Sequence, residues 1–179
     1  MNSFSQLLST GFILLLTLIP LAHAEQSNWK SFNYTAIRII DGDTLEATDG
    51  NIKFKVRIVG MDAPEHDQAF GKVSKAALGD FVLNKKINLQ PVKQGLDRYG
   101  RTLSQVYVDG QDVSLLMIQK GLATYYRPEC KDYPESANRY NYDPRSYVQA
   151  ETQAKQAKLN IWSVAIFELP CTFRHKAKH

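Results

Sequence analysis

The chain has 179 residues and carries 22 Lys and Arg residues against 18 Asp and Glu residues, a formal net charge of +4 with neutral His. This length suits one domain that buries its own core, so several metals or many disulfides are not needed for folding. The modest positive charge allows a polyanionic partner, but it is also common in proteins that never bind nucleic acid.

The first 24 residues predict a secretory signal peptide. They contain no Lys, Arg, Asp or Glu, and their apolar stretch is too interrupted to predict a membrane span. It ends in Ala22-His23-Ala24, an A-x-A pattern that favours cleavage by signal peptidase. We therefore expect a secreted or periplasmic protein whose mature domain covers residues 25–179. The alternative is an uncleaved N-terminal anchor, because residues 1–6 lack the usual Lys or Arg.

Strand patterns extend over residues 34–58. A stretch with three isoleucines comes first, and further along apolar and cationic residues alternate up to Ile58. This alternation places Arg57 opposite the core face. Asp49 and Gly50 lie between the two patterns and favour a hairpin, because Asp-Gly tolerates the positive φ angles of a tight turn.

The following residues combine helical and strand patterns, and five strand segments with interspersed helices predict a small Greek-key barrel. In chain order we first expect an amphipathic helix over residues 69–83, whose apolar residues at helical spacing are Phe70, Val73, Ala76, Ala77 and Phe81. Strands follow over residues 87–92 and 103–108. A short helix then extends from an N-cap at Asp112 to Gly121, and another from a capping box at Ser146 and Gln149 to about Leu159.

The two cysteines, Cys130 and Cys171, are far apart in sequence and could pair in an oxidising compartment. Closing that loop would contribute about 4 kcal/mol by a model-dependent entropy estimate. The alternative is two unpaired thiols. Cys130 belongs to a stretch from Pro128 to Pro144 that predicts a long surface loop, and the end of the chain from Arg174 is typical of a solvated basic tail.

Carboxylates and arginines gather in four short segments at the predicted strand ends. These are Asp41-Gly42-Asp43-Thr44, Arg57, Asp62-Ala63-Pro64-Glu65 and Asp97-Arg98-Tyr99-Gly100-Arg101. Each segment alone is more often a turn or loop, but their joint occurrence in this order is far more specific. Hydrolysis of a phosphodiester needs a hard cation, a group that activates or orients water, and fixed positive charge. The four segments supply all three.

Individual residues match these needs. Asp43 and Asp62 offer the hard oxygen ligands that Ca²⁺ prefers, and the backbone carbonyl of Ala63 adds another. Glu65 is near enough in sequence to act through a water molecule. The arginines stay protonated, and each planar guanidinium can hold two phosphate oxygens.

Several motifs of the chain also occur together in one known family. They are Ile39-Ile40-Asp41-Gly42-Asp43-Thr44, the five-residue step from Arg57 to Asp62, Asp62-Ala63-Pro64-Glu65, Tyr99-Gly100-Arg101, Gly121-Leu122-Ala123 and Lys158-Leu159-Asn160-Ile161-Trp162-Ser163. From about Ala36 to Trp162 the chain resembles the staphylococcal nuclease, or thermonuclease, family. The resemblance implies an α+β fold, a five-stranded OB-fold Greek-key barrel with three α-helices, whose core covers residues 34–163 and leaves a C-terminal extension over residues 164–179.

The resemblance also implies an activity and a site. It implies a Ca²⁺-dependent endonuclease that binds one ion and cleaves DNA and RNA to leave 3′-phosphate and 5′-hydroxyl ends. By position it assigns catalysis to Arg57, Glu65 and Arg101, metal ligation to Asp43, Asp62 and the Ala63 carbonyl, and substrate contacts to Arg98, Tyr99 and Tyr126. We expect a monomer that favours single-stranded substrate, has no stable protein partner, and leaves the membrane once the signal is removed.

Two departures from the family pattern accompany these expectations. Ala63 replaces a common Thr, which matters little because the expected ligand is a backbone oxygen. Residues 65–71 form a short segment where the staphylococcal protein has a long lysine-rich loop, so we expect substrate access and the orientation of Glu65 to differ from the family pattern. The alternative functions are a noncatalytic OB-fold module that binds nucleic acid or a protein, and an envelope-bound structural protein; other divalent metals are an alternative to Ca²⁺.

Overall fold

A computed structural model describes residues 32–127, 130 and 143–176. The expected signal peptide and most of the expected loop between Pro128 and Pro144 lie outside these residues. Among the described helices, none combines the length and the apolar character that crossing a membrane requires.

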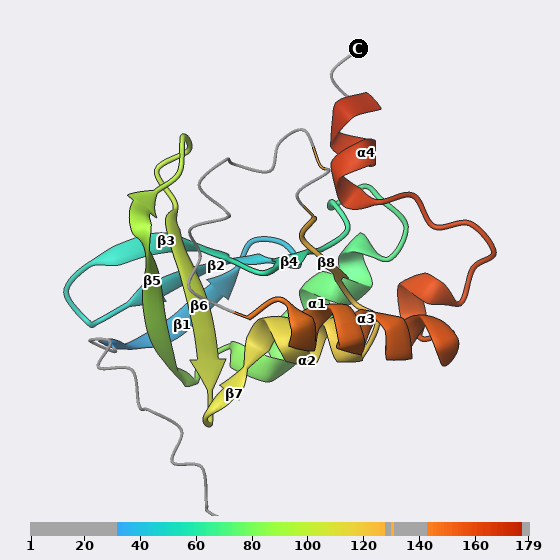
Figure 1. Cartoon of the computed structure of the whole chain (residues 1–179). Helices are drawn as coiled ribbons and strands as arrows, with labels where there is room; N and C mark the ends of the chain where they lie inside the picture. Colours follow the sequence, from blue (N-terminus) through green and yellow to red (C-terminus); the bar gives the residue numbers. More distant parts are fainter. Residues whose placement is uncertain (1–31, 128–129, 131–142, 177–179) are drawn as a thin grey trace, which may run out of the picture.

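The described elements form a β-barrel with helices on one side (Figure 1). In chain order they are β1 (Phe32–Ile39), β2 (Thr44–Thr48), β3 (Lys53–Ile58), β4 (Met61–Asp62), α1 (Gly71–Val82), β5 (Lys86–Leu96), β6 (Thr102–Val108), β7 (Gln111–Asp112), α2 (Val113–Gln119), β8 (Thr124–Tyr125), α3 (Arg145–Gln156), the 3₁₀ helix η2 (Asn160–Trp162) and α4 (Pro170–Lys176).

The barrel closes through one parallel strand pair. Its strands follow the order β3-β2-β1-β5-β6, and β3 also pairs with β6, with Arg57 opposite Leu103. The other neighbours in this ring pair antiparallel. Within the described residues this gives a closed five-stranded barrel, which confirms the expected architecture. Closure removes the exposed strand edges that would otherwise invite pairing with another chain.

The hairpin between β2 and β3 forms as its sequence predicts. The carboxylate of Asp49 accepts hydrogen bonds from the backbone N–H groups of Asn51 and Ile52 at 2.8 and 2.9 Å. Gly50 has a φ of 104°, a conformation that L side chains rarely adopt. The turn fixes the register in which Thr44 lies opposite Arg57, so two residues of the predicted site come together at one end of the strands.

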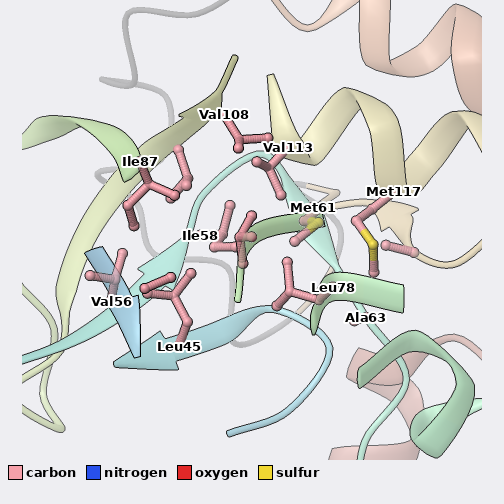
Figure 2. Close-up of a cluster of buried hydrophobic side chains, with 14 of the residues drawn as sticks. Leu45, Val56, Ile58, Met61, Ala63, Leu78, Ile87, Val108, Val113 and Met117 are labelled. Carbon is pink, nitrogen blue, oxygen red and sulfur yellow. The ribbon is translucent and has the colours of Figure 1, made fainter. Parts of the chain in front are cut away.

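The core joins the barrel to the helices. Barrel side chains such as Leu45, Val56 and Ile87 belong to one cluster with Leu78 of α1 and Met117 of α2, and Figure 2 shows these side chains gathered between the strands and the helices. All five are buried almost completely. Since burial of such a side chain stabilises the fold by about 1.5–3 kcal/mol, this shared core fixes the helices against the barrel.

Helix α1 buries only part of the face that its apolar spacing predicts, since Ala77 and Phe81 pack against the core but Ala76 is exposed. Val73 is exposed, whereas Ser74 is buried and its hydroxyl donates to the Leu122 carbonyl oxygen at 2.6 Å. This hydrogen bond satisfies the serine, so a polar residue can face the core. The helix therefore packs through Ser74, Leu78 and Val82, a spacing of four residues that places them on one side.

Helices α2 and α3 are connected through an N-cap. The carboxylate of Asp112 accepts hydrogen bonds from the backbone N–H groups of Ser114 and Leu115, which confirms the predicted cap. The Tyr147 hydroxyl of α3 donates to the same carboxylate. The capping box expected at the start of α3 does not form, because the Ser146 hydroxyl donates to the Asp143 carbonyl oxygen instead.

A fourth helix follows the three that the sequence predicts. Helix α4 (Pro170–Lys176) lies apart from α1, α2 and α3 and beside the chain between β4 and α1 (Figure 1). A disulfide bond joins Cys171 in this helix to Cys130, with 5.8 Å between the Cα atoms. The C-terminal extension is therefore a folded part of the molecule up to Lys176.

Candidate active site

The turn between β1 and β2 carries two carboxylates into the site. Asp41 accepts a hydrogen bond from the backbone N–H of Asp43 at 3.0 Å, which closes the turn. A Cβ on Gly42 would lie 2.6 Å from the Ala63 Cβ and 3.0 Å from the Ser74 Cβ, so only glycine lets this turn pack so closely. Burial, and secondly the negative charge of Asp43, raises the pKa of Asp41 to about 7.

Arg57 lies at the end of β3 and joins two carboxylates. Its Nη1 is 2.8 Å from Asp43 Oδ2 and its Nη2 is 3.2 Å from Asp62 Oδ1. It also donates to the carbonyl oxygens of Ile58 and Met61. The side chain leaves the core face, as predicted, yet the residue is only 9% exposed. Burial acts to lower its pKa, but the charges of Asp43 and Asp62 outweigh burial and raise it.

Asp62 is the most deeply buried carboxylate of the site, at 1% exposure. Strand β4 holds it through pairing with β8, and its backbone carbonyl accepts from the Thr124 hydroxyl at 3.2 Å. The next backbone N–H, that of Ala63, donates to Asp43 Oδ2 at 3.1 Å. Burial raises the pKa of Asp62 to about 6, although the neighbouring guanidinium groups of Arg174 and Arg57 act to lower it.

Glu65 is held by the short segment that leads into α1. Its backbone N–H donates to the side-chain oxygen of Gln68 at 3.1 Å, and its carbonyl accepts from the Gln68 N–H at 3.0 Å. A Cβ on Gly71 would lie 1.9 Å from the Glu65 carbonyl oxygen, so only glycine fits at the first residue of α1 without a shift of the backbone. The Glu65 side chain is 37% exposed, and it shares an ion-pair partner with Asp62.

That shared partner is Arg174 of α4, which the sequence analysis placed in a solvated tail. The structure contradicts that prediction. Arg174 Nη1 donates to Asp62 Oδ1 at 2.9 Å and to Glu65 Oε1 at 2.7 Å, and Nη2 donates to Asp62 Oδ2 at 3.0 Å. One signal could have found it: Cys171 precedes it by one helical turn, so a Cys130–Cys171 bond brings Arg174 along.

Arg101 belongs to the corner between β5 and β6. Asp97 Oδ1 accepts from the backbone N–H groups of Tyr99 and Arg101, and Asp97 Oδ2 lies 2.7 Å from Arg101 Nε. Burial acts to raise the pKa of Asp97, but these hydrogen bonds and the Arg101 charge lower it overall. Arg101 Nη1 then donates to Thr44 Oγ1 at 3.3 Å, which connects the corner to the turn that carries Asp43.

Aromatic rings lie beside three arginines of the site. The guanidinium carbon of Arg57 is 5.7 Å from the ring centroid of Tyr126. Those of Arg98 and Arg101 are 4.9 and 5.3 Å from the ring centroid of Tyr99, which is 64% exposed. The residues expected to contact substrate therefore adjoin the expected phosphate-binding arginines.

The donor set fits a hard cation held by few protein ligands. Asp43 and Asp62 share Arg57 as a partner, and the Ala63 peptide is hydrogen-bonded to Asp43. Among the described residues no three carboxylate side chains bring oxygens within 4.8 Å of one another. Because Ca²⁺ takes about six to eight oxygens, water and substrate would have to complete such a site. Its oxygen-only chemistry suits Ca²⁺ and excludes a thiolate metal site, since both nearby cysteines are in the disulfide.

Comparison with known proteins agrees with this geometry. A family model described as staphylococcal nuclease homologue matches residues 55–164. The chain belongs to the staphylococcal nuclease family. It is therefore a nuclease that hydrolyses nucleic acid, and the barrel described above is the OB-fold of that family.

Individual relatives cover most of the chain. An uncharacterized endonuclease of Haemophilus influenzae is 35% identical over 159 residues, which are 88% of this chain and 79% of that protein. A micrococcal nuclease of Shigella flexneri is 31% identical over 84% of this chain and 85% of its own. A thermonuclease of Staphylococcus hyicus is 31% identical over 87% of this chain and 98% of its own.

Proposed function

We propose that this nuclease depends on Ca²⁺ and cleaves DNA and RNA internally to leave 3′-phosphate and 5′-hydroxyl ends. The observation that carries the proposal is the guanidinium of Arg57, which joins the carboxylates of Asp43 and Asp62 in one buried cluster. Asp43, Asp62 and the Ala63 carbonyl would hold the ion. When bound, Ca²⁺ supplies a Lewis acid that polarises the phosphate and balances its negative charge.

The side chains around this cluster divide the remaining chemistry. Arg57 and Arg101 would hold the nonbridging phosphate oxygens and stabilise the added charge of the transition state. Glu65 would orient a water molecule and accept its proton at a carboxylate oxygen while the water oxygen bonds to phosphorus. The bond between phosphorus and the 5′-oxygen then breaks, and that oxygen takes a proton from solvent, which leaves the proposed ends.

Substrate binding would use the aromatic and cationic residues at the rim. Tyr99 is exposed beside Arg98 and Arg101, and Tyr126 lies beside Arg57. An exposed ring can stack on an unpaired base, with a contribution of about 1–3 kcal/mol per base. Bases of a duplex are already stacked and paired, so we propose a preference for single-stranded substrate and assign Arg98, Tyr99 and Tyr126 to its binding.

A cation titration on matched substrates tests the proposed function. Chelator-stripped protein is mixed with single-stranded and duplex DNA and RNA of one sequence, and Ca²⁺, Mg²⁺ or Mn²⁺ is added stepwise. We expect internal cleavage that saturates with Ca²⁺, stops on renewed chelation, and yields 3′-phosphates that a phosphatase removes. Full cleavage without divalent cation would contradict the Ca²⁺ dependence, and binding without cleavage would support a noncatalytic OB-fold module.

We also propose that the protein is a monomer exported to the periplasm or beyond. Support comes from the Cys130–Cys171 disulfide, because such bonds persist in oxidising compartments and are rare in the cytosol. Cell fractionation followed by determination of the mature N-terminus tests the export. A mature chain beginning at Glu25 is the expected result, and an intact chain held in the membrane would support the uncleaved anchor.

A further inference from the structure

The C-terminal arm, defined here as residues 164–176, is attached to the segment that carries Glu65. The side-chain amide of Gln68 donates to the Glu168 carbonyl oxygen at 2.6 Å, while the same side chain accepts from the Glu65 backbone. The rings of Phe70 and Phe167 meet edge to face at 6.5 Å between centroids. Polar and apolar contacts therefore hold the arm in one place, independently of any single ion pair.

A covalent bond fixes the same arm beside Asp62. One sulfur each of Cys130 and Cys171 and one carboxylate oxygen of Asp62 all lie within 4.8 Å of one another. Both cysteines are buried and bonded to each other. Helix α4 is thus anchored one turn before Arg174, and this anchor limits how far the guanidinium can move from the carboxylates.

Arg174 occupies carboxylate oxygens of the proposed ion ligand Asp62 and of the proposed base Glu65. It takes both carboxylate oxygens of Asp62 and one of Glu65, at 2.7 to 3.0 Å. Asp62 is almost completely buried, so solvent screens its charges weakly. A divalent ion on Asp62 would place two further positive charges beside Arg174 and Arg57. Like charges at such short range repel strongly. The ion and the Arg174 guanidinium would also compete for the same oxygen lone pairs of Asp62.

We propose that Arg174 is an intramolecular competitor for the divalent cation, held over Asp62 and Glu65 by the disulfide-anchored arm. Its guanidinium must leave at least one Asp62 oxygen when the ion binds, so it sets the cation concentration at which the nuclease becomes active. The inference rests on the proposed function, since it assumes that Asp62 is an ion ligand. It adds a residue outside the matched segment 55–164 to the active site.

Calorimetric titration of Ca²⁺ into chelator-stripped, disulfide-bonded full chains tests the competition. Arg174→Gln removes the charge, and Arg174→Lys keeps the charge but loses the bidentate fork. Arg145→Gln removes an arginine of an exposed ion pair with Asp143 and serves as the control. Melting temperatures before titration establish that each variant is folded. If Arg174→Gln does not fold, Arg174→Lys still tests the competition.

We expect Arg174→Gln to bind Ca²⁺ about tenfold more tightly or better than wild type, since hydrogen bonds to charged groups are the strong ones. The Ca²⁺ affinity of Arg174→Lys should lie between those of wild type and Arg174→Gln, and that of Arg145→Gln should equal wild type. The Ca²⁺ concentration for half-maximal cleavage should shift in the same order. Unchanged or weaker Ca²⁺ binding in Arg174→Gln would overturn the competition.

The Cys130→Ser, Cys171→Ser double variant tests whether the disulfide bond strengthens the competition by Arg174. Freed from its anchor, Arg174 should compete less, so Ca²⁺ affinity should rise by less than in Arg174→Gln. An affinity equal to wild type would overturn the role of the anchor. If no protein of the set bound Ca²⁺ or cleaved nucleic acid, the proposed ion site itself would fail, whereas equal tight binding by all would overturn only the role of Arg174.

Discussion

Two arginines of the candidate site, Arg57 and Arg101, are held in different ways. Arg57 is buried between Asp43 and Asp62 and donates to backbone carbonyls of the barrel. Arg101 lies at the β5–β6 corner, where its main partner is Asp97 of the same turn. Buried contacts from the barrel therefore hold the Arg57 guanidinium, whereas a local ion pair at the β5–β6 corner holds the Arg101 guanidinium. The same chemical group should thus contribute unequally to stability and equally to catalysis.

The largest effect is expected from Arg57→Gln. This change leaves the carboxylates of Asp43 and Asp62 buried without their shared partner, and breaking a buried pair costs about 3–5 kcal/mol. Loss of one preorganised charge should also lower turnover by roughly 10² or more. Urea unfolding and steady-state cleavage kinetics measure the two effects. A variant with wild-type stability would show that the cluster of Arg57, Asp43 and Asp62 does not stabilise the barrel.

Arg101→Gln is the matched change at the corner. Turnover should again fall by roughly 10², because Arg101 is proposed to stabilise the same phosphate as Arg57. Stability should change by no more than about 1 kcal/mol, since the ion pair with Asp97 is local and partly solvated. Unfolding and kinetics under the conditions used for Arg57→Gln give the comparison directly. Equal destabilisation by both variants would contradict the expected difference in stability contribution between the buried Arg57 and the corner residue Arg101.

A pair of glycine substitutions in α1 probes the framework beside Glu65. Gly71→Ala places a Cβ 1.9 Å from the Glu65 carbonyl oxygen, and such overpacking typically costs about 1–3 kcal/mol. Gly79→Ala meets only Ile39 Cγ1, at an ordinary 3.7 Å, and should stabilise the helix by about 0.5–1 kcal/mol. Thermal melts of both variants test these opposite signs. Destabilisation by Gly79→Ala would contradict the packing described for α1.

The smallest effect on stability is expected from Tyr99→Ala at the exposed rim. Removal of a stacking ring should weaken substrate binding by about 1–3 kcal/mol per base. The change should raise KM for single-stranded substrate more than it lowers kcat, and it should leave stability nearly unchanged because the ring is exposed. Kinetics on single-stranded and duplex DNA provide the measurement. An equal KM on both substrates, in wild type and variant, would argue against base stacking at Tyr99.

Local chemistry made the barrel and much of the site predictable from sequence. The hairpin at Asp49 and Gly50 and the N-cap at Asp112 each depend on residues within a few positions, so their pattern carries the information. Position in the family motifs was enough to select Arg57 and Asp62. The structure adds the contacts between them, because strand pairing places Thr44 opposite Arg57.

Long-range contacts set the limit of the sequence analysis. Arg174 contacts Asp62 across 112 residues, and no periodicity or local motif around Arg174 specifies that pairing. The buried face of α1 was predicted only in part for a similar reason, since Ser74 becomes a core residue only when the distant Leu122 carbonyl accepts its hydrogen bond. In both cases a polar group is placed by a partner far away in the sequence, and for Arg174 the one available signal was the possible Cys130–Cys171 pairing.

The most direct test of the account is a calorimetric Ca²⁺ titration of wild type beside Asp43→Asn. The substitution keeps the shape of the side chain and removes the negative charge that pairs with Arg57 and that the proposed ion would need. We expect one Ca²⁺ per wild-type chain and no measurable binding to the variant. Equal Ca²⁺ binding by both proteins would contradict the claim that the carboxylates joined by Arg57 form the cation site.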